Sequence, residues 1–182
     1  MPELNRGAVE AKKITHIGIV VHDRDKTIEK YSKMFGWGPW HTETFAPPAL
    51  SDTIVRGRPT HYTMKMAMTM VDSMNSPVGS LAGKIGFEVI EPDEGRSIYH
   101  EFLKKKGEGL HHIGYYDVES TEDLKKALDA FEKMGVKVLQ SGKYRDETRE
   151  SEFYYMDTES LFGVVCETRR FGRVTKGETK GP

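Results

Sequence analysis

Short apolar runs typical of strands alternate along the chain with two segments of helical spacing. In the clearer helical segment, apolar residues recur at i, i+3, i+4, i+7 and i+10, with charged residues between them. This stripe consists of Leu124, Ala127, Leu128, Phe131 and Met134. Ser120 is the expected start of the helix, and Gly135 is its expected left-handed stop.

A narrower apolar stripe predicts an earlier helix, which begins after Asp23 or Asp25 and ends at Gly36. Strand-like runs surround the two helices at matching places. They cover residues 14–21, 40–45, 62–71 and 84–90 in the first half and residues 110–116, 136–139, 152–156 and 163–168 in the second. Each half therefore reads strand, helix and three further strands.

The two halves also share a sequence repeat. The tripeptide His-Ile-Gly begins at His16 and again at His112, 96 residues later, and each following helix closes on Lys-Met and then a Gly. A βαβββ unit exposes one face of its sheet, so two units can bury those faces by pairing. We therefore expect an α+β fold in which two βαβββ modules pair into a curved, partly closed mixed β-barrel.

The expected domain covers residues 12–170. It divides into module one, a connector helix and module two, at residues 12–92, 96–107 and 109–170. Prolines among polar residues predict a long loop at residues 47–59. The two ends, residues 1–11 and 171–182, carry few core residues and are expected to be frayed and flexible.

Composition narrows the partners and the compartment. The 182 residues include 27 Lys and Arg against 28 Asp and Glu, and this near-neutral balance argues against nucleic acid, which needs a concentrated cationic face. A mean hydropathy of -0.59 and the lack of a long apolar run argue against a membrane span. Because Cys166 is the one cysteine and the N-terminus lacks a secretory apolar core, we expect a cytoplasmic protein without disulfides.

Strand alternation places two histidines and two glutamates at matching positions of the repeat. His16 and His112 each share a strand face with the glycine two residues later, while Glu88 and Glu167 each interrupt an apolar final strand. Taken singly, each histidine could be an ordinary core residue, and each glutamate could be a solvated residue at a strand end. A carboxylate in an apolar run is usually paired or bound to a metal, because burying it alone is costly. The matched set of N and O donors suits one divalent ion.

Four motifs resemble the vicinal oxygen chelate superfamily, which includes glyoxalases, bleomycin-resistance proteins and dioxygenases. They are His-Ile-Gly-Ile-Val-Val at residues 16–21, Phe-Glu-Val-Ile-Glu-Pro at 87–92, Gly-Glu-Gly-Leu-His-His-Ile at 107–113 and Gly-Val-Val-Cys-Glu at 163–167. Within the superfamily, the methylmalonyl-CoA epimerase and glyoxalase I branches are the most similar. The resemblance implies metal ligands at His16, Glu88, His112 and Glu167, and it implies that His111 points to the opposite face.

The resemblance also implies an enzyme, namely an isomerase, epimerase or lyase. A divalent ion would polarise a substrate carbonyl while a carboxylate moves a proton through an enolate-type intermediate. Co, Ni, Zn, Mn, Mg and Fe(II) all stay open as the metal. A small-molecule substrate, such as an acyl-CoA or an α-hydroxycarbonyl compound, and a homodimer are the expected partners.

One strand departs from the epimerase pattern. Epimerases of this type resemble one another in having a further, non-ligand glutamate on the third strand of the first half, but residues 62–70 here contain no acid. The general base is therefore expected to be Glu167 or Glu88. The open alternatives are Glu43, His61 and Lys65.

The same strand carries methionines at positions 64, 66, 68 and 70, which alternate and so share one face. They either pack in the core or line a pocket with adaptable apolar surface. The predicted substrate contacts are Met66, Tyr154 and Arg149. Arg149 could meet an anionic substrate or simply be solvated.

Two other functions stay open. An extradiol-type dioxygenase would use two histidines and one carboxylate on Fe(II), which leaves Glu88 without a metal role. A bleomycin-resistance-like protein would bind a small molecule without a metal, which leaves the four ligand types unexplained. One scaffold hosts many chemistries, so the site itself must decide.

Overall fold

The computed structural model describes residues 9, 13–76 and 79–174. Its elements follow one another as β1 (His16–Val20), α1 (Arg24–Phe35), β2 (His41–Phe45), β3 (Leu50–Val55), β4 (Arg58–Pro59), β5 (Tyr62–Ser76), β6 (Gly79–Gly95), α2 (Ile98–Lys106), β7 (Gly109–Val118), α3 (Thr121–Lys133), β8 (Val138–Arg145), β9 (Arg149–Met156), α4 (Glu159–Phe162) and β10 (Val165–Arg173). In this part of the chain, no helix is long and apolar enough to cross a membrane.

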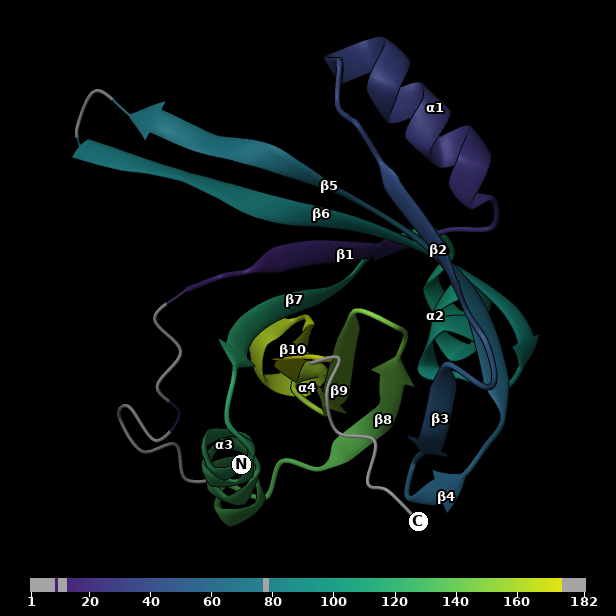
Figure 1. Ribbon diagram of the computed structural model, residues 1–182, viewed down its shortest axis with the longest axis vertical. Helices are drawn as coiled ribbons and strands as arrows, with labels where there is room; N and C mark the ends of the chain where they lie inside the picture. The colour runs from purple at the N-terminus through teal and green to yellow at the C-terminus, as the bar shows by residue number, and fades with distance from the viewer. Residues whose placement is uncertain (1–8, 10–12, 77–78, 175–182) are drawn as a thin grey trace.

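The strands form one mixed sheet in the order β2-β5-β6-β1-β7-β10-β9-β8-β3-β4. At its centre β1 and β7, the first strands of the two halves, run antiparallel, and each has the last strand of its own half on its other side in parallel. The sheet curls into a half-barrel, with the long β5–β6 hairpin projecting from the body (Figure 1). The expected α+β fold of two paired βαβββ modules is confirmed.

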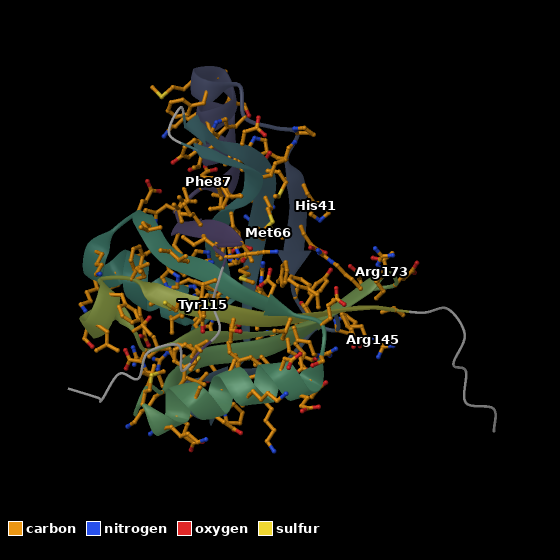
Figure 2. All side chains as sticks on the ribbon, turned by 90° about the vertical axis from the view of Figure 1, so that its left-hand side faces the viewer. His41, Met66, Phe87, Tyr115, Arg145 and Arg173 are labelled. Carbon is orange, nitrogen blue, oxygen red and sulfur yellow. The ribbon has the colours of Figure 1, made fainter. Side chains whose placement is uncertain are left out.

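Helices α1 and α3 lie toward opposite ends of the molecule with strands between them (Figure 2). The amphipathic stripe of α3 buries Leu124, Ala127 and Phe131, and the Ser120 side chain accepts a hydrogen bond from the backbone N–H of Asp123 as the N-cap. Burying a large apolar side chain stabilises a fold by about 1.5–3 kcal/mol, so this stripe fixes α3 on the sheet. Asp23 caps α1 in the same way.

The other face of the sheet encloses the largest apolar cluster. Tyr62 and Tyr99 are fully buried there, together with Val20, Ile90 and Tyr155. Tyr99 belongs to the connector helix α2, so this helix packs inside the curl rather than on its outer face. The cluster fills one part of the concave side and leaves the rest for the site described below.

Two segments differ from the sequence-based expectation. Residues 47–59, expected to be a loop, contain the β3–β4 hairpin, and β3 pairs with β8 of the second module. Arg56 and Gly57 turn this hairpin with positive φ angles, so its connection is a tight two-residue turn. At the other end, β10 continues to Arg173, three residues into the segment expected to be a flexible tail. The expected frayed ends otherwise lie mostly outside the described residues.

Candidate metal centre

Strand register brings the two histidines and two glutamates to one place. The first row across the sheet contains Gly86, His16, Gly114 and Glu167, on β6, β1, β7 and β10. The second row, two residues along β1, contains Glu88, Gly18, His112 and Val165. The sequence repeat relates His16 to His112, Gly18 to Gly114 and Glu88 to Glu167. The equivalent residues therefore occur in the second row in the opposite order. Residues two apart share a strand face, so all four ionisable side chains project to the same side.

Glycines make room for the two imidazole rings. A Cβ atom placed on Gly18 would lie 1.9 Å from Cε1 of His112, and one on Gly114 would lie 1.8 Å from Cε1 of His16. Each glycine of a His-Ile-Gly motif therefore accommodates the histidine of the other module. The sequence predicted space beside each ring, and the structure shows that this space is reciprocal.

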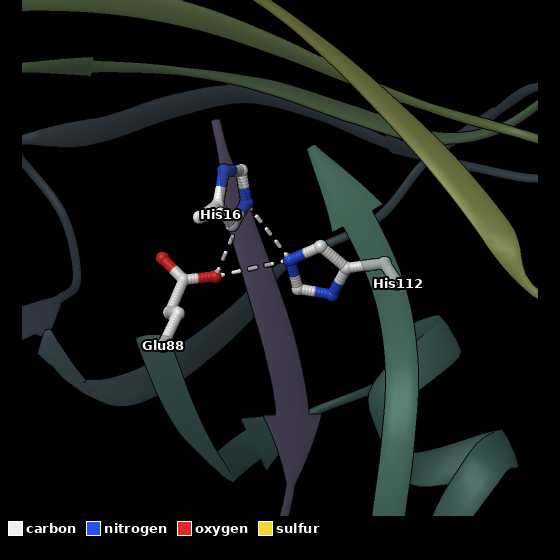
Figure 3. Close-up of side chains that lie close together, drawn as sticks. All are labelled: His16, Glu88 and His112. Carbon is white, nitrogen blue, oxygen red and sulfur yellow. Dashed lines mark hydrogen bonds and ion pairs between the residues drawn. The ribbon is translucent and has the colours of Figure 1, made fainter. Parts of the chain in front are cut away.

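The four side chains converge on their donor atoms. Nε2 of His16 lies 2.7 Å from Oε2 of Glu167, and Nε2 of His112 lies 3.1 Å from Oε2 of Glu88. The two Nε2 atoms are 3.2 Å apart. Figure 3 shows three of these side chains pointing toward one another from three neighbouring strands. All four are at least 94% buried, with exposures of 1% and 0% for the histidines and 6% and 2% for the glutamates.

This donor set fits a divalent cation. The donor atoms of His16, Glu88 and His112 all lie within 4.8 Å of one another, close enough to share one ion. Oε2 of Glu167 lies 2.7 Å from Nε2 of His16 and 3.9 Å from Nε2 of His112, so it borders the same place. Oε2 of Glu167 is buried without a hydrogen bond of good geometry. A buried carboxylate oxygen in that position is strongly stabilised by a cation.

Neighbouring charges keep both carboxylates ionised. Burial alone would raise the pKa of Glu167, but Arg169 and His16 outweigh it and lower the pKa to about 2. For Glu88, burial alone would also raise the pKa, but the hydrogen bond with His112 and the electrostatic interactions with the two imidazoles outweigh it, so the net pKa is lowered. Both glutamates are thus held as anions, the form that binds a metal or accepts a proton.

A second set of contacts orients the histidine rings from behind. Nδ1 of His16 lies 3.0 Å from Oγ1 of Thr15 and 3.1 Å from Nη2 of Arg169. Nδ1 of His112 lies 3.0 Å from Nδ1 of His111. Burial lowers the pKa of His111 well below its usual value, so His111 is neutral and can accept the proton of His112 Nδ1. Partners of this kind fix which ring nitrogen faces a metal.

The expected orientation of His111 is wrong. Simple alternation places it on the face opposite His112, but the pairing of β1 with β7 passes from Gly18 opposite His112 to Ile19 opposite Leu110. His111 is thus the extra residue of a β-bulge. Its ring packs against Tyr99, 5.3 Å between centroids, and against His112, so it lies on the inner side.

A cavity of about 520 Å³ opens beside the four side chains. Glu88 and Glu167 line it, while the apolar part of its wall includes the alternating methionines of β5. These are Met64, Met66, Met68 and Met70. The pocket alternative for the methionines agrees with the structure, and Met64 also belongs to the buried apolar cluster. Met66 lines the cavity, and its contact with a substrate stays a prediction.

The other two predicted substrate contacts, Arg149 and Tyr154, lie in different places. Arg149 lines the cavity, but Tyr154 does not, because alternation along β9 directs Tyr155 into the cavity and turns Tyr154 toward the cluster of Phe131 and Met156. Of the alternative bases, His61 and Lys65 do not line the cavity; Lys65 pairs instead with Glu91 at 2.7 Å.

Glu43 contacts two residues of the cavity wall, Tyr144 and Arg149. It is therefore the one alternative base that stays near the site. Cys166 packs on the opposite face from Glu167, with the residues that contact α3.

Sequence reasoning missed Arg169. Its guanidinium lies in the cavity wall, makes two hydrogen bonds of 3.1 Å to Asp117 and approaches Oε2 of Glu167 to 3.7 Å. It stands two residues after Glu167 on the same strand face, which was the available signal. The repeat hid it, since Ile90 takes the corresponding position in the first module.

Comparison with known proteins decides the family. Residues 15–155 match the family described as the glyoxalase/bleomycin resistance protein/dioxygenase superfamily. The chain belongs to this superfamily. That assignment agrees with the vicinal oxygen chelate resemblance of the four motifs. No curated protein matches the chain significantly in sequence.

Solved structures of the superfamily share the fold. A variant of Streptomyces coelicolor methylmalonyl-CoA epimerase in complex with 2-nitronate-propionyl-CoA has 27% identity and a TM-score of 0.55, over 87% of this chain and 96% of that one. A methylmalonyl-CoA epimerase in complex with methylmalonyl-CoA and NH4+ has 26% identity and a TM-score of 0.55, over 87% and 93%. The Mycobacterium tuberculosis epimerase, at 20% identity, a TM-score of 0.55 and 92% of each chain, agrees in fold.

Proposed function

We propose that this chain is a divalent-metal-dependent isomerase, epimerase or lyase, which moves a proton next to a substrate carbonyl. The observation that carries the proposal is the meeting of two histidines and two ionised glutamates beside one cavity. The superfamily membership and the likeness to epimerases that bind acyl-CoA compounds support an acyl-CoA or a related carbonyl compound as substrate.

The proposed ligands are His16, Glu88, His112 and Glu167. A bound ion, whether Co, Ni, Zn, Mn, Mg or Fe(II), would act as a Lewis acid that polarises the substrate carbonyl and makes its α-proton more acidic. With Nε2 of each ring used as a ligand, each ring proton must sit on Nδ1. His111 can accept it from His112. Thr15 can accept it from His16, but the contact of His16 Nδ1 with Nη2 of Arg169 would then have to open, because a guanidinium N–H only donates.

Glu167 and Glu88 are the proposed proton carriers. Both line the cavity, so either carboxylate can reach a substrate there. The lowered pKa of each keeps it deprotonated near neutral pH, and it also makes each a weaker base than an ordinary glutamate. Arg169 holds charge beside Glu167 and so limits how strong a base that residue is. The methionines of β5 would hold the apolar part of the substrate and exclude water.

Isotope exchange tests the reaction type. Methylmalonyl-CoA, propionyl-CoA and α-hydroxycarbonyl compounds are incubated with the protein in D2O, with and without a chelator. We expect deuterium at the α-carbon of at least one compound, lost with the chelator and reduced at least tenfold in Glu167→Gln and Glu88→Gln. Absence of exchange together with O2 consumption on catechols would replace this proposal by the dioxygenase alternative.

A cytoplasmic location and a homodimer stay predictions from the sequence and the family resemblance. Analytical ultracentrifugation of the purified chain would test the second of them, with a mass twice that of the 20.7 kDa chain as the expected result.

A further inference from the structure

Three side chains from both modules meet at the wall of the cavity. The Glu43 carboxylate, on β2, accepts hydrogen bonds from the Tyr144 hydroxyl on β8 and from Nη2 of Arg149 on β9. Strand β2 is one edge of the sheet, and β8 lies near the other. The contact therefore closes the curl of the sheet beside the cavity.

Arg149 is held in place from its other side. Asp146 accepts hydrogen bonds from the backbone N–H groups of Thr148 and Arg149 and from Nε of Arg149 at 3.3 Å. The guanidinium also lies over the ring of Tyr144, 5.2 Å from its centroid. Its Nη2 edge thus points at a fixed place, which Glu43 fills.

Arg149 differs from Arg169, the other arginine in the cavity wall, in its exposure to solvent and in its partners. Arg169 is committed to Asp117 by two hydrogen bonds and is 13% exposed. The Arg149 side chain is 35% exposed, and the carboxylate on its Nη2 comes from an edge strand. A ligand that reaches Arg149 from the cavity must displace one contact, that of Glu43, whose side chain is 15% exposed.

We propose that a carboxylate of the substrate displaces Glu43 and binds in its place to Arg149 and Tyr144. The substrate is then an acid with two anionic groups, one of which lies at this place, away from the metal centre. This inference rests on the proposed function, since it names the substrate class of the same cavity.

The exchange keeps the number of contacts, because the substrate carboxylate accepts the hydrogen bonds from Arg149 and Tyr144 that Glu43 gives up. Guanidinium–carboxylate contacts are strong and directional, and a hydroxyl beside them adds a further donor. The displaced Glu43 has a partner ready, because Nε2 of His41 lies 3.6 Å from its Oε2 and the His41 side chain is 64% exposed.

Calorimetric titration of the full chain tests the proposal with matched small acids. The probes are malonate, succinate and glutarate, each paired with its monoamide, which has the same shape without the second charge. We expect at least one diacid to bind about tenfold more tightly than its monoamide. Arg149→Met should abolish this difference, whereas Glu43→Gln should enlarge it, because the neutral amide releases Arg149. Arg145→Met, in the same hairpin but outside the cavity wall, is the matched control (Figure 2).

The opposite signs of the two variants separate recognition from mere closure of the barrel. If Glu43 and Arg149 only joined the sheet edges, both variants would weaken the diacid and the monoamide alike, and that result overturns the proposal. Equal binding of diacid and monoamide by wild type and by Glu43→Gln overturns it as well. Should Arg149→Met fail to fold, as judged by circular dichroism, Glu43→Gln and Tyr144→Phe decide, since the latter must reduce the preference. Lack of metal or of α-proton exchange would contradict the proposed function while leaving the diacid preference intact.

Discussion

His16 and His112, 96 residues apart, face each other with their Nε2 atoms 3.2 Å apart, and each ring occupies space that a glycine of the other module leaves free. The relation is reciprocal because β1 and β7 are antiparallel and equivalent under the repeat. Two identical short motifs thus build one site between them. A change in either motif affects the histidine of the other.

Alanine in place of Gly18 or Gly114 should damage the site across the module boundary. The added Cβ would overlap the ring of His112 or His16, so the ring must move, at a cost of about 1–3 kcal/mol in unfolding free energy. We expect at least a tenfold loss of metal affinity in each variant. Denaturant unfolding and calorimetric metal titration measure the two effects.

Gly172→Ala is the control for this pair. Gly172 lies in the same sheet, on β10, but its new Cβ would meet Cγ and Oε1 of Glu150, at 3.0 Å, and Nη1 of Arg170, at 3.3 Å. Its metal affinity should equal that of wild type. Unchanged metal affinity in Gly18→Ala and Gly114→Ala would contradict the account of the reciprocal cradle.

The repeat explains why so much of the site could be predicted from the sequence. The register of four strands follows from two copies of one pattern, so His16, Glu88, His112 and Glu167 stand out as candidates from their matching positions, and the family resemblance implies their role as ligands. Features that break the repeat could not be found in this way. Arg169 has no counterpart in the first module.

Departures from regular alternation account for the remaining differences. His111 faces inward because a bulge adds one residue to β7, and no local pattern in the sequence announces that bulge. The β3–β4 hairpin depends on pairing with β8, about 90 residues later in the chain. Such long-range pairing overrides the local loop signal of its prolines.

His111 should act on the metal through His112. In His111→Phe the ring volume is kept but the acceptor for His112 Nδ1 is lost, so the orientation of His112 is no longer fixed. Loss of such a partner typically costs 10–100-fold in metal affinity, which calorimetry would measure. Phe102→Leu, which alters packing against the same ring without a polar change, should have a smaller effect. Equal losses in both variants would reduce His111 to a packing role.

Tyr144 should make the stability of the fold fall at alkaline pH. Burial, the hydrogen bond to Glu43 and the charge of Glu43 raise its pKa to about 12 from an ordinary value of 10.0. The folded state holds this proton more tightly than the unfolded chain does. Its contribution is therefore complete below pH 10 and is lost as the pH rises through about 12.

Tyr144→Phe removes that dependence. Urea unfolding at stepped pH should show a shallower decline of the unfolding free energy between pH 10 and about 12 than in wild type. Tyr154→Phe, a tyrosine on the outer side of the sheet whose pKa is also raised by burial, serves as a comparison. A decline as steep in Tyr144→Phe as in wild type would show that Glu43 does not hold the Tyr144 proton.

The metal content of the purified chain tests the central claim most directly. Elemental analysis should find about one divalent ion per chain in wild type after dialysis against Zn, Co or Mn, and a loss of at least 80% of it, roughly the effect of removing one of four ligands, in His112→Ala and in Glu88→Ala. Arg145→Met should keep the full amount. Stoichiometric metal in all of these variants, or no bound ion in wild type with any of the three metals, would contradict the assignment of His16, Glu88, His112 and Glu167 as one metal centre.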